Sequence, residues 1–233
     1  VGGNFMKTLT HILIILIWGQ IVYGQEFQKT TDIPIGLLLA KSVYYEKQEL
    51  TKQIGLDDLI KTRDSLKVRF WDADKVVEII KNDSIEINVY PIFYSKKGRL
   101  ITQKLVVENL DKEAFLNRLN NFKIKTLPDY STISNYKHFN SGFTYCFEIS
   151  TNDKYRFYSY YRPQNQERID EAFYVSEIVD FIDKSINWSK LLNDFQENLK
   201  FGRYKYRTVI ISFESGENYI PCDVEYKKRL FKK

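Results

Sequence analysis

Residues 143–162 read FTYCFEISTNDKYRFYSYYR, and this stretch decides the fold. Its first half, Phe143–Ser150, alternates between two sets of side chains, as a β-strand does. Its second half, Tyr155–Arg162, carries aromatic residues on both faces. The polar residues Thr151–Lys154 between two such runs predict a β-hairpin. The turn does not fix the register, so the sequence leaves open which residues of the second half share the face of Phe143.

Five other runs have the composition of strands. Leu66–Trp71 alternates apolar and basic positions, and two β-branched runs flank the polar turn Lys81–Ser84. The first of these two, Val76–Ile80, could instead continue a helix from Asp74, but its Val-Val and Ile-Ile pairs are mediocre helix formers. Pro91 places the end of the next run at a sheet edge or a bulge. We expect strands at 66–71, 76–80, 85–90, 100–107 and 203–213.

Helical periodicity is clearest at residues 111–122. Asp111 is placed as the N-cap of this helix, and Leu110 and Phe115 occupy the two ends of a hydrophobic staple. The longest predicted helix, 166–184, has an apolar stripe and a side rich in carboxylates. We expect further helices at 37–48 and 188–199. The apolar stripe is Ile169, Ala172, Phe173, Val175, Ile178, Val179 and Ile182, and the carboxylates are Glu167, Asp170, Glu171, Glu177 and Asp180.

Strands joined by hairpin turns and interleaved with amphipathic helices indicate an α+β fold. We expect an antiparallel sheet of hairpins, with the amphipathic helices packed on one face and the hairpin at 143–162 under the long helix. No repeat, low-complexity segment or Pro/Gly/Ser-rich linker interrupts the chain after residue 35. The sequence therefore predicts a single α+β domain at 34–213, preceded by a flexible extension at 25–33 and followed by a basic tail at 214–233.

Residues 1–24 comprise a few upstream residues, Val1–Phe5, followed by a segment with the layout of a secretory signal peptide. Lys7 supplies a basic start, Ile12–Trp18 an apolar core, and Val22–Gly24 the small or modest residues that a signal peptidase reads. The alternative is a transmembrane anchor, which needs about 20 apolar residues. We expect cleavage after Gly24, a periplasmic or secreted protein, and no transmembrane anchor after cleavage.

The composition excludes two broad classes of protein. The chain has 233 residues, of which 43% are hydrophobic and 28% charged, and this excludes a wholly disordered chain. Its formal net charge of +5 is not gathered into the Lys and Arg clusters of a nucleic-acid-binding surface. The one dense basic cluster, Lys227–Lys233, is interpreted as a solvated tail or as a weak contact with anionic lipid or a polyanion.

The sequence lacks several catalytic and cofactor-binding patterns. After signal cleavage only His138 remains as a histidine, and neither an acid nor a nucleophile lies beside it. One histidine and two distant cysteines do not have the spacing of a zinc site, and no Gly-rich phosphate loop or dinucleotide motif is present. We expect no cofactor and no metal. The carboxylates of the long helix are expected to form a solvated face rather than a calcium site.

Cys146 and Cys222 are the only two cysteines. Export to an oxidising compartment permits a disulfide between them, which would close a long loop and stabilise the folded state by roughly 4 kcal/mol. The alternative is two free thiols, with Cys146 acting as a small hydrophobic residue in its strand. The sequence leaves both alternatives open, because it does not show whether the two side chains approach each other.

Glu148 is the single candidate for a catalytic residue, because it lies within an aromatic hairpin. Loss of water around a carboxylate raises its pKa, so Glu148 could serve as the general acid of a hydrolase that acts on a glycan. The second acid of such a reaction is not identified. The other interpretation of Glu148 is a salt bridge on the face of the sheet.

The aromatic surplus of 17 Tyr and 16 Phe has two interpretations. These residues fill the core of a sheet, or they form a binding surface together with arginines. Strand alternation directs some side chains away from the core, so we expect at least two of the hairpin tyrosines to be exposed on the face opposite the long helix. The expected binding residues are Tyr155, Arg156, Tyr158, Tyr160, Tyr161 and Arg162.

Several short motifs lie within about residues 66–184. They are Val68-Arg69-Phe70-Trp71, Leu127-Pro128-Asp129, Gly142-Phe143-Thr144-Tyr145 with Glu148, Tyr155-Arg156-Phe157-Tyr158-Ser159-Tyr160, and Pro163 before a Glu-rich helix. Together with the signal peptide, this set resembles uncharacterised exported proteins of Bacteroidota bacteria. The resemblance implies a location in the envelope or outside the cell, and it carries no known activity.

The sequence leaves three functions open. The first is a non-enzymatic interaction domain, in the envelope or secreted, that binds an unknown protein or glycan of the cell envelope through the hairpin. The second is the carboxylate-dependent hydrolase, and the third is a structural or inhibitor-like module. An exposed aromatic patch would favour the interaction domain, whereas two carboxyl groups facing each other in a cleft would favour the hydrolase.

Overall fold

The computed structural model describes residues 29–34, 38–138, 142–200, 202–206, 209–214 and 217–219. The predicted signal peptide at 1–24 lies outside these residues, and so does the basic cluster Lys227–Lys233. In the part of the chain that is described, no helix combines the length and the apolar character that are needed to cross a membrane.

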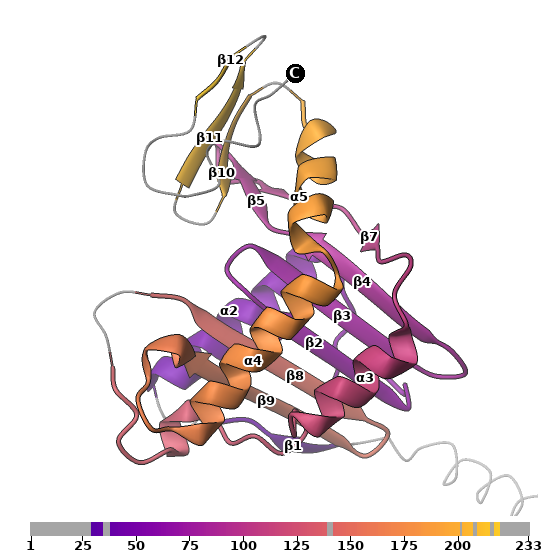
Figure 1. Ribbon diagram of the computed structural model, residues 1–233, viewed down its shortest axis with the longest axis vertical. Coiled ribbons are helices and arrows are strands. Elements are labelled where there is room, and N and C mark those ends of the chain that lie inside the picture. Colours follow the sequence, from indigo (N-terminus) through magenta and orange to yellow (C-terminus); the bar gives the residue numbers. More distant parts are fainter. Residues whose placement is uncertain are drawn as a thin grey trace, which may run out of the picture.

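A mostly antiparallel sheet of seven strands forms the body of the molecule (Figure 1). Its strand order is β1-β9-β8-β2-β3-β4-β7, in which β1 runs parallel to β9 and the other neighbours are antiparallel. Together with the helices, this sheet gives the predicted α+β fold. The strands are β1 Thr30–Asp32, β2 Leu66–Trp71, β3 Lys75–Lys81, β4 Ile85–Pro91, β7 Leu105–Val106, β8 Thr144–Thr151 and β9 Lys154–Tyr161.

The two hairpins predicted from polar turns are confirmed. β3 pairs with β4 and β8 pairs with β9, so the helical alternative from Asp74 is wrong. In the second hairpin Phe147 lies opposite Tyr158 and Glu148 lies opposite Phe157, which gives the register that the turn left open. Because paired residues share a face, one face carries Phe147 with Tyr158 and the other carries Glu148 with Phe157.

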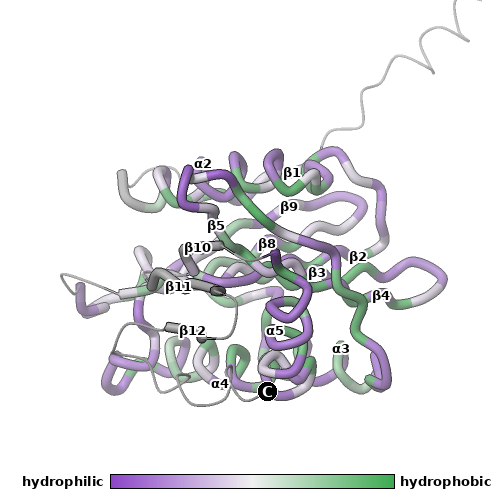
Figure 2. Tube along the Cα trace, turned by 90° about the horizontal axis from the view of Figure 1, so that it is seen from above, coloured by the Kyte–Doolittle hydropathy of each residue, from purple (hydrophilic) through white to green (hydrophobic). Residues whose placement is uncertain are grey.

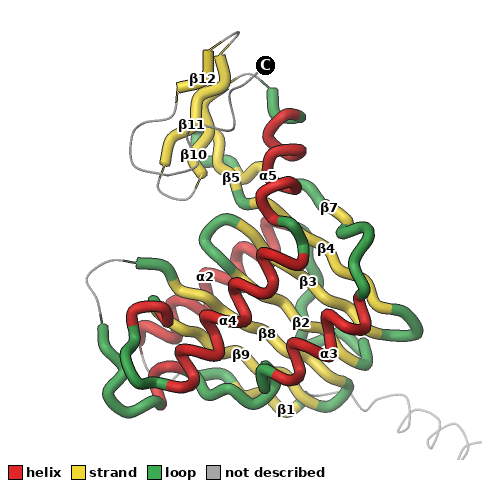
Figure 3. Tube along the Cα trace, in the orientation of Figure 1, coloured by secondary structure: helices red, strands yellow, loops and turns green. Residues whose placement is uncertain are grey.

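A second sheet of five short strands, ordered β12-β11-β10-β5-β6, lies beyond one end of the main sheet (Figure 3). Two expectations of a single strand are wrong here. Residues 100–107 split into β6 and β7, which belong to different sheets, and residues 203–213 form the paired strands β10 and β11. The strands are β5 Phe93–Ser95, β6 Leu100–Ile101, β10 Gly202–Tyr206, β11 Val209–Glu214 and β12 Glu217–Tyr219.

The predicted limits of the folded domain are too narrow at both ends. Residues 25–33, expected as a flexible extension, contain β1, and its Thr30 N–H donates to the Asp153 carbonyl over 2.9 Å. Residues 214–233, expected as a basic tail, contain β12. Both strands are three residues long and are stabilised by a neighbouring strand, so their own composition carries little signal.

The helices predicted from periodicity are observed with different ends. Asp111 caps α3 as predicted, because its Oδ1 accepts the N–H of Ala114 over 3.0 Å. α4 begins at Asp170 instead of residue 166, since a 3₁₀ turn at Pro163–Asn165 and a positive φ of 58° at Arg168 precede it. The helices are α2 Leu38–Ile54, α3 Lys112–Asn121, α4 Asp170–Ser185 and α5 Trp188–Glu197, with a further 3₁₀ turn at Tyr130–Thr132.

The helices cover both faces of the main sheet, so the expectation that they pack on one face is wrong. Figure 2 shows the sheet between α2 on one side and α3 and α4 on the other. Two separate buried clusters agree with these three layers. The physical reason is that the second face also carries large apolar side chains, such as Trp71 and Phe157, which need cover from water.

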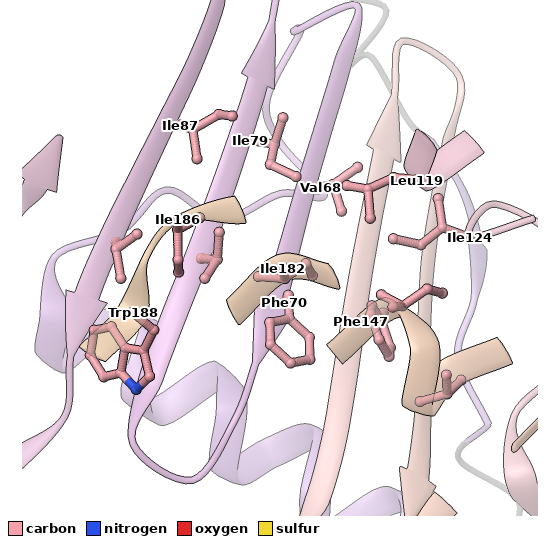
Figure 4. Close-up of a cluster of buried hydrophobic side chains, with 14 of the residues drawn as sticks. Val68, Phe70, Ile79, Ile87, Leu119, Ile124, Phe147, Ile182, Ile186 and Trp188 are labelled. Atoms are coloured by element: carbon pink, nitrogen blue, oxygen red, sulfur yellow. The ribbon is translucent and has the colours of Figure 1, made fainter. Parts of the chain in front are cut away.

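The larger core lies on the face that α3 and α4 cover (Figure 4). Val68, Phe70 and Ile79 belong to its strands, and Ile182 of α4 lies among them. Trp188, the first residue of α5, extends the same cluster at the end where α4 meets α5. This continuous apolar layer contributes most of the burial that stabilises the fold.

Candidate functional site

The tyrosines of the β8–β9 hairpin lie inside the molecule, contrary to expectation. Tyr155, Tyr158 and Tyr160 are buried and Tyr161 is partly buried, so the prediction of at least two exposed tyrosines is wrong. Tyr158 and Tyr160 belong to the core under α4, whereas Tyr155 belongs to the core under α2. Alternate side chains of a strand point to opposite faces of the sheet. Because α2 covers the second face, the rings on that face lie in a second core and are not exposed to solvent.

The two arginines of the hairpin make contacts within the molecule. Arg156 Nε lies 2.7 Å from Asp32 Oδ2 of β1, and its Nη2 donates to the Leu127 carbonyl over 3.0 Å. Arg162 has a left-handed backbone, and a Cβ added at Gly142 would lie only 2.2 Å from its Cδ. Of the six predicted binding residues, three tyrosines are buried, and Arg156 forms an ion pair with β1 at the edge of the sheet.

A row of four polar residues crosses the sheet on the face that α2 covers. The strand register places Glu148 beside Arg69, Arg69 beside Glu78, and Glu78 beside Asn88. All four are buried. Arg69 Nη1 donates to Glu148 Oε2 over 2.9 Å, and its Nη2 donates to Glu78 Oε1 over 2.7 Å. One guanidinium therefore binds two carboxylates, one from each neighbouring strand.

Glu148, the predicted catalytic candidate, is 0% exposed. Besides the bond from Arg69, its Oε1 accepts the amide of Gln48 over 3.0 Å and the hydroxyl of Tyr155 over 3.2 Å. Burial raises the pKa of Glu148, and the charge of Arg69 opposes this rise. This arrangement corresponds to the second interpretation of the residue, a salt bridge on the face of the sheet.

Two buried lysines extend this polar layer. Lys67 Nζ lies 2.7 Å from Asp57 Oδ2, and this hydrogen bond lowers the pKa of Asp57. Lys29 Nζ donates to the Leu59 carbonyl over 3.1 Å and to the hydroxyl of Ser150. Burial lowers the pKa of Lys29. Each cation has oxygen partners, as buried charges require.

A second buried ionic cluster surrounds Lys75. Its Nζ lies 2.9 Å from Asp72, 3.3 Å from Asp74 and 3.0 Å from Asp183 of α4. Burial lowers the pKa of Lys75, but these carboxylates outweigh burial and the net pKa is raised. The Tyr206 hydroxyl of β10 donates to Asp74. The cluster therefore connects the β2–β3 turn, α4 and the second sheet.

Cys146 and His138 occupy very different environments. Cys146 is buried and forms no disulfide within the described residues, and burial raises the pKa of its thiol to about 12. Cys222 lies outside the described residues, so the disulfide between them stays a prediction. His138 is exposed, and its ring lies 5.8 Å from that of Tyr130. Within the described segments, no three His, Cys, Asp or Glu side chains group together as a metal ion would require.

The outward side of α4 presents an exposed aromatic ring among carboxylates. Phe173 is 61% exposed, more than any other large hydrophobic residue in the described part of the chain. Asp170, Glu177 and Asp180 are exposed as well, and the spacings of three and four residues place them on the same side of the helix as Phe173. These four residues are referred to below as the outer face of α4.

The assignment of Phe173 to the apolar stripe is therefore wrong. Successive side chains of an α-helix are rotated by about 100° around its axis. Phe173 directly follows the buried Ala172, so its side chain points away from the buried side. Its separation of three residues from Asp170 and of four from Glu177 is the signal that places it with the carboxylates. The buried residues of α4 are Ala172, Val175, Ile178 and Ile182.

α2 also exposes an aromatic ring, but among mixed charges. Tyr45 is 56% exposed. Its exposed neighbours along the helix are Lys41, Glu49 and Lys52, and Lys52 Nζ lies 3.8 Å from Glu49 Oε2. Tyr45 is thus a matched control for Phe173, with a similar ring and exposure on the opposite side of the sheet.

Comparison of the chain with protein-family models, with curated proteins and with solved structures gives no match.

Proposed function

We propose that this chain is an exported interaction domain, without catalytic activity of its own, that binds a basic segment of an envelope protein through the outer face of α4. The observation that carries the proposal is the 61% exposure of Phe173 between exposed carboxylates. Export is supported by the basic, apolar and small-residue pattern of residues 6–24. Sequencing of the secreted protein should begin at or near Gln25, and recovery of an uncleaved form that requires detergent would contradict export.

An exposed aromatic ring is a suitable anchor for a protein partner. Aromatic side chains are enriched among the residues that contribute most of the binding energy at interfaces, because a large and rigid area is buried at a low cost in entropy. The surrounding carboxylates of Asp170, Glu177 and Asp180 select the partner by charge. A segment that carries Lys or Arg beside an apolar side chain fits both properties.

The hydrolase alternative receives no support from the position of Glu148. A general acid must reach the substrate within hydrogen-bond distance. Glu148 is fully buried and accepts hydrogen bonds from Arg69, Gln48 and Tyr155. Its raised pKa follows from burial in the scaffold.

The proposal is tested by comparing Phe173→Ser with the matched control Tyr45→Ser. Both variants and the unchanged protein are immobilised and exposed to an envelope extract, and any captured protein is then purified for titration. We expect Phe173→Ser to weaken binding at least about tenfold, as loss of an interface hot spot does, and Tyr45→Ser to leave it unchanged. Equal capture by both variants would contradict the proposal.

The role of charge is tested separately on the same face. Replacing Glu177 and Asp180 by Lys should abolish capture, because the new charges repel a basic partner. Glu49→Lys on α2 is the control with the same type of charge reversal. Capture that is insensitive to Glu177→Lys with Asp180→Lys would show that the partner is not recognised by its positive charge.

A further inference from the structure

We infer that residues 227–233 of the same chain occupy the outer face of α4 when no partner is bound. The inference rests on the surface named in the proposed function and adds a competitor for it. The segment reads Lys227-Lys228-Arg229-Leu230-Phe231-Lys232-Lys233, which is five cations around one apolar pair. The outer face of α4 has the complementary pattern, with carboxylates on both sides of one aromatic ring.

Two of the three carboxylates of the outer face have no ion-pair partner within the described residues. Lys184 Nζ lies 3.7 Å from Asp180. Within the described residues, the carboxylates of Asp170 and Glu177 form no ion pair of 4.0 Å or less. They flank an exposed Phe173, so a cationic segment with an apolar centre would neutralise the charges and cover the ring together.

The dimensions of the two elements agree. Asp170 and Asp180 are ten residues apart on a helix, which corresponds to about 15 Å. An extended segment from Lys227 to Lys233 spans about 20 Å. Laid along α4, it would place Leu230 and Phe231 near the middle of the face, with cations over the carboxylates at each end.

The chain is long enough for this contact to form within one molecule. β12 ends at Tyr219, and the eleven residues from there to Leu230 reach at most about 36–40 Å. α4 is about 24 Å long, and Figure 1 shows α5 continuing from α4 toward the sheet that contains β12. A tethered segment has an effective concentration in the millimolar range, which favours the same chain over a second copy.

Carbodiimide cross-linking of the full chain tests the inference, because this reagent joins lysines only to carboxylates that touch them. In the monomer fraction at low salt, we expect Lys227, Lys228, Lys232 and Lys233 to be joined to carboxylates of the outer face. Adding salt should suppress these products, since the contact is electrostatic. Glu49 of α2 is the internal control, because it is exposed on the opposite side of the sheet.

Two charge reversals provide the matched comparison. Replacing Glu177 and Asp180 by Lys, a change confined to exposed positions, should reduce cross-links from residues 227–233 to Asp170 at least about fivefold. Glu49→Lys should leave them unchanged. Cross-links found equally on Glu49, or found only in a dimer fraction, would overturn the inference.

The inference and the proposed function fail in different ways. If the segment does not cross-link to α4 but Phe173→Ser still abolishes partner capture, the inference is wrong and the proposed function stands. If the cross-links form but no captured partner depends on Phe173, the proposed function is wrong. Where both hold, Leu230→Ser with Phe231→Ser should strengthen partner binding, because the competing segment is weakened.

Discussion

Arg69 binds two carboxylates at once, and each member of this buried row therefore has a large influence on stability. Its guanidinium lies between Glu78 and Glu148, on strands to either side of its own. Taking such charges out of water is costly, and their mutual contacts compensate for that cost only while all partners are present. Removing one partner leaves an uncompensated buried charge.

We predict that Glu148→Ala lowers the free energy of unfolding by about 3–5 kcal/mol, the range for breaking a buried ion pair. Urea denaturation followed by circular dichroism measures the change. Asp180→Ala, which removes the exposed i,i+4 contact with Lys184, is the control and should change stability by less than about 1 kcal/mol. Equal effects of the two substitutions would show that the Arg69 row does not stabilise the fold.

The sequence predicted only part of this site. The position of Glu148 in an aromatic hairpin indicated a raised pKa and offered a salt bridge as one interpretation. It did not identify Arg69 as the partner, because that pairing joins strands 79 residues apart and depends on the register of β2 against β8. It also placed Phe173 in the core, because an apolar residue next to a buried position resembles part of the stripe.

At the scale of elements, α3 is the helix whose beginning is defined most locally. The Asp111 carboxylate accepts the N–H of Ala114, one of the backbone donors that the first turn leaves without a helical partner. Phe115, Leu116 and Leu119 then pack into the larger core. The cap and the apolar spacing both come from residues within one helix, so sequence reasoning could identify them.

We predict that Asp111→Ala lowers the free energy of unfolding by about 1 kcal/mol, the typical cost of losing an N-cap. Asp111→Asn keeps an oxygen that can accept the same N–H, so it should cost much less. Thermal unfolding of the two variants and the unchanged protein gives the comparison. If Asp111→Asn is as destabilising as Asp111→Ala, the carboxylate acts through its charge and not through the cap.

Elements that are defined by distant partners were not predictable in this way. β1 and β12 have three residues each, and only pairing with β9 and β11 identifies them as strands. The run at 100–107 divides because Leu100–Ile101 pairs with β5 while Leu105–Val106 pairs with β4. Composition does not distinguish one strand from two, since the apolar residues are the same in both cases.

At the scale of the whole molecule, cover on both faces of the sheet explains the aromatic composition. A sheet covered on one face needs only one set of large apolar residues per strand. With α2 on the second face, both sets are buried, and Tyr155 and Tyr158 of one strand lie in different cores. The surplus of tyrosine is therefore used largely for packing, which was the first of its two interpretations.

This packing predicts a sharp loss of stability in alkali. Burial raises the pKa of Tyr90 and of Tyr130 to about 12, against an ordinary value of 10.0, and also raises the pKa of Tyr158 well above that ordinary value. Above pH 10 the unfolded chain releases phenolic protons that the folded chain retains. The folded state then binds more protons, so stability falls as pH rises from 10 toward 12, whereas this contribution is constant below 10.

Tyrosinate absorbance and circular dichroism, recorded together during an alkaline titration, check this prediction. The exposed tyrosines should ionise first, and the buried ones should ionise in one cooperative step that coincides with loss of structure. The chain unfolded in urea is the reference, in which all of its tyrosines should ionise together near pH 10. Gradual ionisation of every tyrosine without loss of structure would contradict the burial of these side chains.

The short strand β1 has a consequence for how the molecule behaves in a crowded compartment. β9, with the sequence KYRFYSYY, is aromatic and contains no proline, which is the composition that associates through unpaired strand edges. β1 pairs with the first three residues of that edge, Lys154–Arg156, and Asp32 forms an ion pair with Arg156. Proteolytic trimming of the chain up to Asp32 would uncover the backbone of β9 at Lys154–Arg156. We therefore expect the few residues that follow the predicted cleavage site to reduce aggregation of the protein through this edge.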